Sequence, residues 1–403
     1  MTSHEPSAER RTSPAEVFRA FLGLGLTSFG GPVAHLGYFR EAFVVRRGWI
    51  DDRAYADLVA LCQFLPGPAS RQVGMAIGLA KAGLPGALAA WCGFTLPSAL
   101  AMIVVGYGIV AYGAIVPPGV LHGLKVVAVA VVAQAVLGMA RSLTPDAPRL
   151  VMALAAALAV LAVPAAWMQI AVIAAGGLVG LALLKARTTD APVSLGVAVP
   201  KPLAIASLAA FAILLVGLPL LAGWSTSQAL KVADAFYRAG SLVFGGGHVV
   251  LPLLQQELVP RGWVSNDAFL AGYGAAQAVP GPLFTFAAYL GTVLASEPNG
   301  WRGGFLALVS IFLPSLLLVV GALPFWEELR HNGAARRAMQ GVNAAVVGLL
   351  AAALVTPVGQ SAILSPIDLL LAGAAYALVT MARVPPWAVV LMTALAGWGL
   401  GGK

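Results

Sequence analysis

Long apolar runs separated by short polar segments dominate this chain. Six stretches contain no Asp, Glu, Lys or Arg: 83–124, 150–184, 202–230, 303–326, 338–367 and 384–402. Each is long enough for one or two membrane-spanning helices, since one crossing takes about 20 residues. Their apolar positions do not alternate with polar ones, as the strands of a membrane barrel would require. The pattern therefore predicts an all-α polytopic membrane protein.

Composition and charge support this class. Of the 403 residues, 60% are hydrophobic and only 10% are charged, which excludes an ordinary soluble domain. The net charge of +8 comes from basic residues that flank the apolar runs. That arrangement is typical of membrane proteins rather than of a nucleic-acid surface. We expect a lipid bilayer around the chain, no nucleic-acid partner, and no cleavable signal peptide in the polar segment 1–16.

A pattern of helix-breaking residues occurs twice, in the same order. The first copy reads SFGGP (28–32), RGW (47–49), QFLPGP (63–68) and TLPS (95–98), and the second reads VFGGG (243–247), RGW (261–263), QAVPGP (277–282) and FLPS (312–315). Matched breaks in two halves of a membrane chain are typical of transporters built from repeats. We predict an N-terminal repeat over 13–184 and a C-terminal repeat over 231–401. Segment 185–230 supplies a cytoplasmic loop and one linker transmembrane helix.

The loop charges predict that the two repeats are inserted in opposite orientations. The loop after the first break carries Arg40, Arg46, Arg47 and Arg53, whereas its counterpart carries only Arg261. The asymmetry reverses later, because the loop at 117–118 has no basic residue and its counterpart has several. Since positive loops stay in the cytoplasm, this pattern gives inverted-topology repeats and a cytoplasmic N-terminus. We expect about six helical elements, some broken or re-entrant, in each repeat.

The breaks predict where a substrate binds. Helices that start at Pro32 and Pro68, and their counterparts in the second repeat, direct unpaired N–H groups toward the membrane midplane. Each such end carries about half a positive charge, so an anion is the ligand that converging ends favour. The predicted substrate-binding residues are Gly30, Gly31, Pro32, Gly67, Pro68, Ala69, Ser70, Arg71, Gln72, Gly245, Gly246, Gly247, Gln277, Gly281, Pro282 and Thr285.

Two histidines follow the glycine breaks. His35 and His248 are candidates for proton coupling, because histidine titrates near neutral pH. The alternative for each is a neutral ring hydrogen-bonded to a carbonyl. The sequence shows no metal-ligand cluster, cofactor motif, nucleophile–base pair or Walker loop. We therefore expect a protein that is not an enzyme and that has no cofactor and no metal site.

The break motifs resemble a known family. The segment FLGLGLTSFGGPVAHL (21–36), followed by QFLPGP (63–68), is similar to the N-terminal signature of the chromate ion transporter family. The segment FGGGHVVLPL (244–253) resembles the signature of the second half. The likeness covers both repeats, as in the long-chain exporters of that family. One departure is Arg71, where the family pattern leads us to expect a small polar residue.

The resemblance implies secondary active export of chromate, a sulfate-like tetrahedral oxyanion, across the bacterial inner membrane. It also implies thirteen segments arranged as two antiparallel halves. Chromate and sulfate have the same charge and shape, so the resemblance does not fix selectivity between them. The alternatives are a passive oxyanion channel, or a proton-coupled exporter of another small anion such as sulfate or an organic metabolite. A homodimer is the expected assembly, on no more than a general basis.

Overall fold

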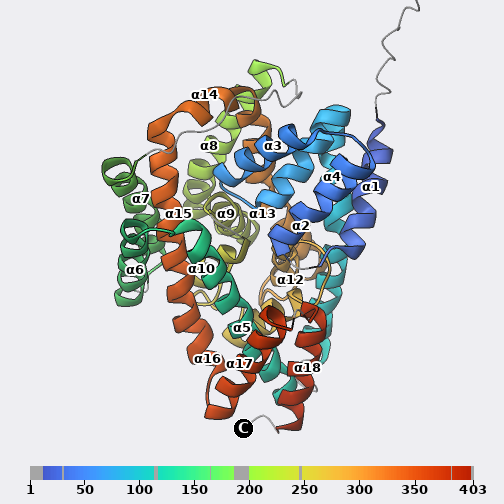
Figure 1. Ribbon diagram of the computed structural model, residues 1–403. Helices are drawn as coiled ribbons and strands as arrows, with labels where there is room; N and C mark the ends of the chain where they lie inside the picture. The colour runs from blue at the N-terminus through green and yellow to red at the C-terminus, as the bar shows by residue number, and fades with distance from the viewer. Residues whose placement is uncertain are drawn as a thin grey trace, which may run out of the picture.

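The computed structural model describes residues 12–29, 31–112, 117–163, 165–185, 199–244, 247–382 and 384–400. Over these residues the chain is helical and contains no strand (Figure 1). Among them, five helices are long and apolar enough to cross a membrane. The prediction of an all-α polytopic membrane protein is confirmed. The inverted orientation of the two halves and their repeat boundaries stay predictions.

The first half and the linker contain eight α-helices within the described residues. They are α1 (Pro14–Thr27), α2 (Gly31–Phe39), α3 (Asp52–Phe64), α4 (Ala69–Tyr112), α5 (Pro118–Leu143), α6 (Ala147–Ala162), α7 (Ala166–Leu183) and the linker helix α8 (Lys201–Trp224). A π-helical segment, Arg40–Arg46, continues α2.

The second half follows the same order. Its α-helices are α9 (Gln228–Ser241), α10 (Val250–Leu258), α11 (Asn266–Ala276), α12 (Phe286–Thr292), α13 (Gly300–Ala322), α14 (Trp326–His331), α15 (Gly333–Ala353), α16 (Gln360–Ala362), α17 (Pro366–Thr380) and α18 (Pro386–Gly399). Short 3₁₀ turns, Gly247–Val249 and Leu283–Thr285, lead into α10 and α12. A π-helical segment, Leu354–Gly359, follows α15.

Matching local signals start and stop the helices of both halves. Helices α1 and α9 each have 14 residues, and each starts after a serine cap, Ser13 or Ser227. A serine oxygen in that position accepts a hydrogen bond from an N–H of the first turn that has no partner within the helix. Backbone of positive φ also occurs at three repeat-equivalent pairs of glycines: Gly48 and Gly262, Gly67 and Gly281, and Gly83 and Gly300. The sequence repeat is therefore also a repeat of backbone geometry.

Helix α4 is two helices in continuous sequence. Ala82 and Gly83 have non-helical torsions, with φ of +63° at Gly83. Glycine adopts this conformation without the steric cost that a Cβ imposes. The segment that starts at Ala69 thus ends at Ala82, and a second apolar helix continues to Tyr112.

Helices from the later part of each half pack against helices of the other half. In the second half, α15 packs against α6 and α7 of the first half, and in the first half α5 packs against α17 and α18 of the second. Figure 1 shows α6 and α7 beside α15, and α17 and α18 beside α5 at the lower end of the molecule. Small residues permit these crossings, as is usual between membrane helices. Gly176 lies against Gly341, and Gly119 lies against Gly397.

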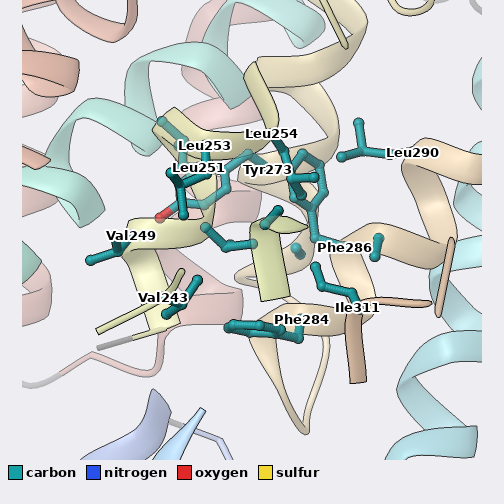
Figure 2. Packing of buried hydrophobic residues seen from close by; sticks show 14 of the residues in the cluster. Val243, Val249, Leu251, Leu253, Leu254, Tyr273, Phe284, Phe286, Leu290 and Ile311 are labelled. Carbon is teal, nitrogen blue, oxygen red and sulfur yellow. The ribbon is translucent and has the colours of Figure 1, made fainter. Parts of the chain in front are cut away.

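The largest apolar cluster lies in the second half and extends into the first. Figure 2 shows Val243, Tyr273, Phe284 and Ile311 among the side chains that converge there. All four are at most 1% exposed. Aromatic edge-to-face contacts, such as that of Tyr273 with Phe286 at 5.7 Å, order the cluster. This packing holds the broken segments of the second half in place around the site described below.

A chain of buried ion pairs joins α9 to α10 and gives a test of stability. Arg238 contacts Asp234 at 2.7 Å and Glu257 at 2.8 Å, and Arg261 contacts Glu257 at 2.7 Å. The carboxylate side chains are only 7% and 10% exposed. Arg238→Met leaves buried charge without its partner, so we expect a loss of about 3–5 kcal/mol in unfolding free energy, measured as a lower melting temperature.

Arg46→Met is the control for that substitution. Arg46 pairs with Glu41 at 2.9 Å, but the two side chains are 75% and 50% exposed. We expect this exposed pair to contribute less than about 1 kcal/mol. Equal melting temperatures for the two variants would contradict the structural role given to Arg238.

Candidate functional site

The glycine break of each half is hydrogen-bonded to the Pro-Gly-Pro turn of the other half. Gly67 donates its N–H to the carbonyl oxygen of Val243 at 2.6 Å, and Gly281 donates its N–H to the carbonyl oxygen of Ser28 at 2.9 Å. Gly67 and Gly281 are equivalent in the two repeats, and so are Ser28 and Val243. The two bonds are therefore one contact made twice, and they lock the broken segments together.

Two repeat-equivalent serines, Ser315 and Ser98, leave no room for a side chain at Gly67 and Gly281. A Cβ on Gly67 would lie 2.5 Å from Ser315 Oγ, and a Cβ on Gly281 would lie 2.8 Å from Ser98 Oγ. The glycines have φ of +119° and +106°, values that other residues rarely adopt. Only glycine fits these positions. The amides of Gly67 and Gly281, which belong to the predicted site, are thus used within the protein and are not free for a ligand.

A cavity of about 260 Å³ adjoins this junction. Four of the predicted residues line it, namely Gly31 from the first half and His248, Gln277 and Gly281 from the second. The remaining lining residues are Val131, Gln134, Ala276, Val279, Leu283, Val379, Val384, Pro385 and Pro386. Since one water takes about 30 Å³, this space can hold a small hydrated anion. The cavity therefore joins the breaks of both halves to α5 and to the connection between α17 and α18.

The polar groups of the cavity are held by their neighbours. His248 Nδ1 and Tyr273 Oη are hydrogen-bonded at 2.6 Å, and Gln277 Nε2 donates to the carbonyl oxygen of Tyr273 at 3.4 Å. Tyr273 is fully buried, so it fixes both side chains. Gln134 is a cavity residue that the sequence reasoning missed. Its signal was a single amide in the apolar run of α5, which spacing alone did not connect to the breaks.

Arg71 lies apart from this cavity, inside the first half. It is 2% exposed, and its Nη1 donates to Thr95 Oγ1 at 2.6 Å. Its guanidinium carbon lies 4.2 Å from the ring centre of Phe94 and 5.5 Å from that of Phe312. The equivalent residue of the second half is Thr285, whose hydroxyl donates to the carbonyl oxygen of Pro282 at 2.7 Å. The two halves thus differ in charge at this position.

His35 also lies outside the cavity. It is 1% exposed, and its ring packs edge-on against Phe94 at 5.1 Å. The structure therefore separates the two histidines that the sequence treated alike, because only His248 lines the cavity. Their non-equivalent positions in the two repeats are consistent with this difference.

The other predicted site residues have mixed positions. Ser70, Gln72 and Gly247 are buried, Ala69 starts α4 and Pro32 lies in the first turn of α2. Gln72 Nε2 donates to the carbonyl oxygen of Pro66 at 2.7 Å. Pro68 accepts N–H bonds from the residues that start α4. Gly30, Gly245 and Gly246, which were also predicted to bind the substrate, lie outside the described residues. Over the residues that are described, no group of three or more His, Cys, Asp or Glu side chains could hold a metal ion.

Fold and site together define a multi-pass helical membrane protein whose two halves meet at paired helix breaks around a polar cavity. The chain matches the family described as "Chromate transporter" over residues 15–181 and again over residues 230–398. The two matches cover most of the chain, one in each half. The protein therefore belongs to the chromate transporter family, as the motifs of the sequence predicted, and it has the long form with two repeats.

Individual relatives agree with this assignment. The chain is 29% identical over 394 residues to the chromate transport protein of Pseudomonas aeruginosa, covering 95% of this chain and 91% of that protein. It is 28% identical over 373 residues to the chromate transport protein of Cupriavidus metallidurans, covering 90% and 85%. It is 25% identical over 358 residues to an uncharacterized transporter of Methanocaldococcus jannaschii, covering 87% and 86%. No solved structure matches the chain.

Proposed function

We propose that this protein exports chromate, or a closely related tetrahedral oxyanion, from the cytoplasm by secondary active transport. The observation that carries the proposal is the cavity where Gly31 of one half meets His248, Gln277 and Gly281 of the other. Membership in the chromate transporter family, and relatives named as chromate transport proteins, support the choice of substrate. Transport, rather than chemical conversion of the anion, is the activity that such a cavity favours.

The anion is held by amide groups and neutral side chains at the breaks. Gly31 is the first residue of α2 and lines the cavity, so the N-terminal end of that helix faces the bound anion. Such an end carries partial positive charge and N–H groups with no partner inside the helix. Gln134 and Gln277 add amide donors from α5 and from the second Pro-Gly-Pro motif. These groups replace part of the hydration that the anion loses near the midplane.

We further propose that the two halves are inverted relative to each other in a bacterial inner membrane, with the N-terminus in the cytoplasm. The basic residues Arg40, Arg46, Arg47 and Arg53 then lie on the cytoplasmic side. Alternating access comes from rocking of one half against the other about the Gly67–Val243 and Gly281–Ser28 contacts. In this scheme the paired contacts act as the pivot, and the cavity opens on one side at a time.

The test is flux measurement in proteoliposomes that contain the purified protein. We expect chromate to accumulate against its own gradient when a proton gradient or membrane potential is imposed, and an uncoupler to abolish the accumulation. We expect sulfate to compete, because both anions are tetrahedral and divalent. If chromate moves only down its own concentration gradient, the protein is a channel and not a secondary active transporter. Indifference to sulfate would count against an oxyanion site.

His248 gives a prediction about pH. Because it lines the cavity and is held by Tyr273, it is the better placed of the two histidine candidates to exchange a proton with the substrate pathway. We expect His248→Ala to change the dependence of the transport rate on pH, because a histidine at the cavity is the group that can exchange a proton with the substrate pathway. The rate is measured at fixed membrane potential. His122→Ala is the control, since His122 pairs with Asp368 away from the cavity. An unchanged pH profile in His248→Ala would remove His248 from the coupling mechanism.

A further inference from the structure

The first half, together with α13 of the second half, contains buried polar atoms without hydrogen-bond partners. Among the described residues, these atoms are Ser28 Oγ, Nε and Nη2 of Arg71, Gln72 Oε1 and Ser315 Oγ, and the buried ring of His35 lies beside them. All five side chains are at most 2% exposed. Buried polar atoms are nearly always hydrogen-bonded, since leaving one without a partner costs about 1–3 kcal/mol. So many in one place indicate that a ligand completes the site.

Helix α4 carries Arg71 and Gln72, and it packs against α1, α2 and α13, which carry or adjoin the other three residues. His35 lies near the guanidinium of Arg71 and is hydrogen-bonded to the backbone of Ser28. His35 and Arg71 also share the ring of Phe94, at 5.1 and 4.2 Å. Gln72 follows Arg71 in sequence. Gln72 Nε2 and Ser315 Oγ lie within 2.8 Å of the position that a Cβ on Gly67 would take. The group therefore surrounds the junction between the first Pro-Gly-Pro turn and the second half.

The group carries positive charge that no carboxylate balances. None of the ion pairs found among the described residues includes Arg71. The sequence contains no Asp or Glu between Asp57 and Asp146. Contacts with the rings of Phe94 and Phe312 stabilise the guanidinium in part. A buried charge of this kind is retained where a counter-charge reaches it, and water supplies none.

The group is separate from the cavity but touches it at one point. None of the five side chains lines the cavity, whereas the carbonyl oxygen of Ser28 accepts the N–H of Gly281, which does. Ser28 therefore stands between the two spaces. The positive charge is present in only one of the two repeats, because Thr285 occupies the position equivalent to Arg71 in the second half. An anion that moved from the cavity past Ser28 would thus approach a full positive charge.

We propose that Ser28, His35, Arg71, Gln72 and Ser315 form an enclosed anion subsite, distinct from the cavity, in which Arg71 selects a divalent oxyanion over a monovalent one. The inference rests on the proposed function, since it assigns a second position to the transported anion. The guanidinium offers Nε and Nη2 to two oxygens of one tetrahedral anion, a bidentate geometry that suits arginine. The serine hydroxyls and the His35 ring contact the remaining oxygens.

The experiment measures equilibrium binding to the full-length protein in lipid nanodiscs. The probe is radiolabelled sulfate, with unlabelled chromate and perchlorate as divalent and monovalent competitors. We expect Arg71→Gln to weaken sulfate and chromate binding about tenfold or more, and to weaken perchlorate binding much less. Arg71→Lys should keep most of the preference for divalent anions. Lys81→Gln, which removes the same charge from the same helix, is the matched control and should leave all three affinities unchanged.

The outcomes separate this proposal from the one on which it rests. If Arg71→Gln binds all three anions as wild type does, water alone satisfies the unpartnered buried atoms. The proposal of an anion subsite is then wrong. If it weakens all three equally, Arg71 is not the selecting residue. A melting temperature measured alongside identifies a variant that has simply lost its fold, and Ser315→Ala then gives a second test by a smaller loss of sulfate affinity. If wild type binds neither sulfate nor chromate, the proposed function itself fails.

Discussion

Replacing Gly281 by alanine should reduce oxyanion transport about 10- to 100-fold while the protein remains in the membrane. The added Cβ would lie 2.8 Å from Ser98 Oγ, and the backbone φ of +106° is one that alanine rarely adopts. Strain of this kind costs about 1–3 kcal/mol, and the contact with Ser98 adds to it. The chain relieves the strain by moving the turn, which breaks the bond from Gly281 to the carbonyl of Ser28. Initial rates of chromate uptake into proteoliposomes measure the effect.

The repeat supplies an internal comparison for this result. Gly67 makes the equivalent bond to Val243 with φ of +119°, so Gly67→Ala should cause a loss of similar size. Gly37→Ala is the control, because a Cβ at Gly37 in α2 meets no atom within 4 Å. Transport at the wild-type rate in both Gly281→Ala and Gly67→Ala would show that the paired contacts between the halves do not matter for function.

Gly341→Val is expected to destabilise the folded protein. Gly341 of α15 faces Gly176 and Gly180 of α7, and a Cβ there would overlap the carbonyl oxygen of Gly176. Overpacking of this kind typically costs about 1–3 kcal/mol, and here backbone rather than a movable side chain opposes it. We expect a lower melting temperature and a smaller yield of monodisperse protein in detergent.

Gly217→Val is the matched control for Gly341→Val. Gly217 lies in α8, and a Cβ at that position meets no atom within 4 Å. The same substitution in an apolar helix should therefore leave the melting temperature nearly unchanged. If Gly341→Val melts at the same temperature as Gly217→Val, the close packing of α15 on α7 does not contribute to stability. The contact between Gly397 and Gly119 makes the equivalent prediction for α18 on α5.

The sequence predicted the helices near the breaks well, because glycine and proline act locally. The ends of α3 and the interruption of α4 at Ala82 follow from residues within a turn of each event. The 3₁₀ turns that begin at Gly247 and Leu283 were not foreseen. They depend on how the second half packs around Tyr273 and Phe284, which periodicity does not report.

The site was predicted in part, and its omissions have a physical reason. Gly31, His248, Gln277 and Gly281 do line one cavity, but Gln134 was missed because it comes from a helix far away in sequence. Gly67 was among the predicted substrate-binding residues, whereas its amide N–H donates to the carbonyl oxygen of Val243 of the other half. Matched motifs identify equivalent positions, but they do not say which motif of one half meets which motif of the other.

Protection of engineered cysteines by anions tests most directly whether the cavity holds the substrate. The chain has two native cysteines, Cys62 and Cys92, which are replaced by alanine first. Gln134→Cys and Gln277→Cys place thiols in the cavity, and Ser142→Cys places one at the exposed end of the same helix, α5. The protein in detergent is labelled with a charged thiol reagent, with and without sulfate or molybdate, which do not oxidise thiols as chromate does.

Either anion is expected to slow labelling at positions 134 and 277 in a concentration-dependent manner and to leave labelling at position 142 unchanged. Labelling at positions 134 and 277 that proceeds at the same rate with and without saturating anion, in protein that still transports chromate, would contradict this expectation.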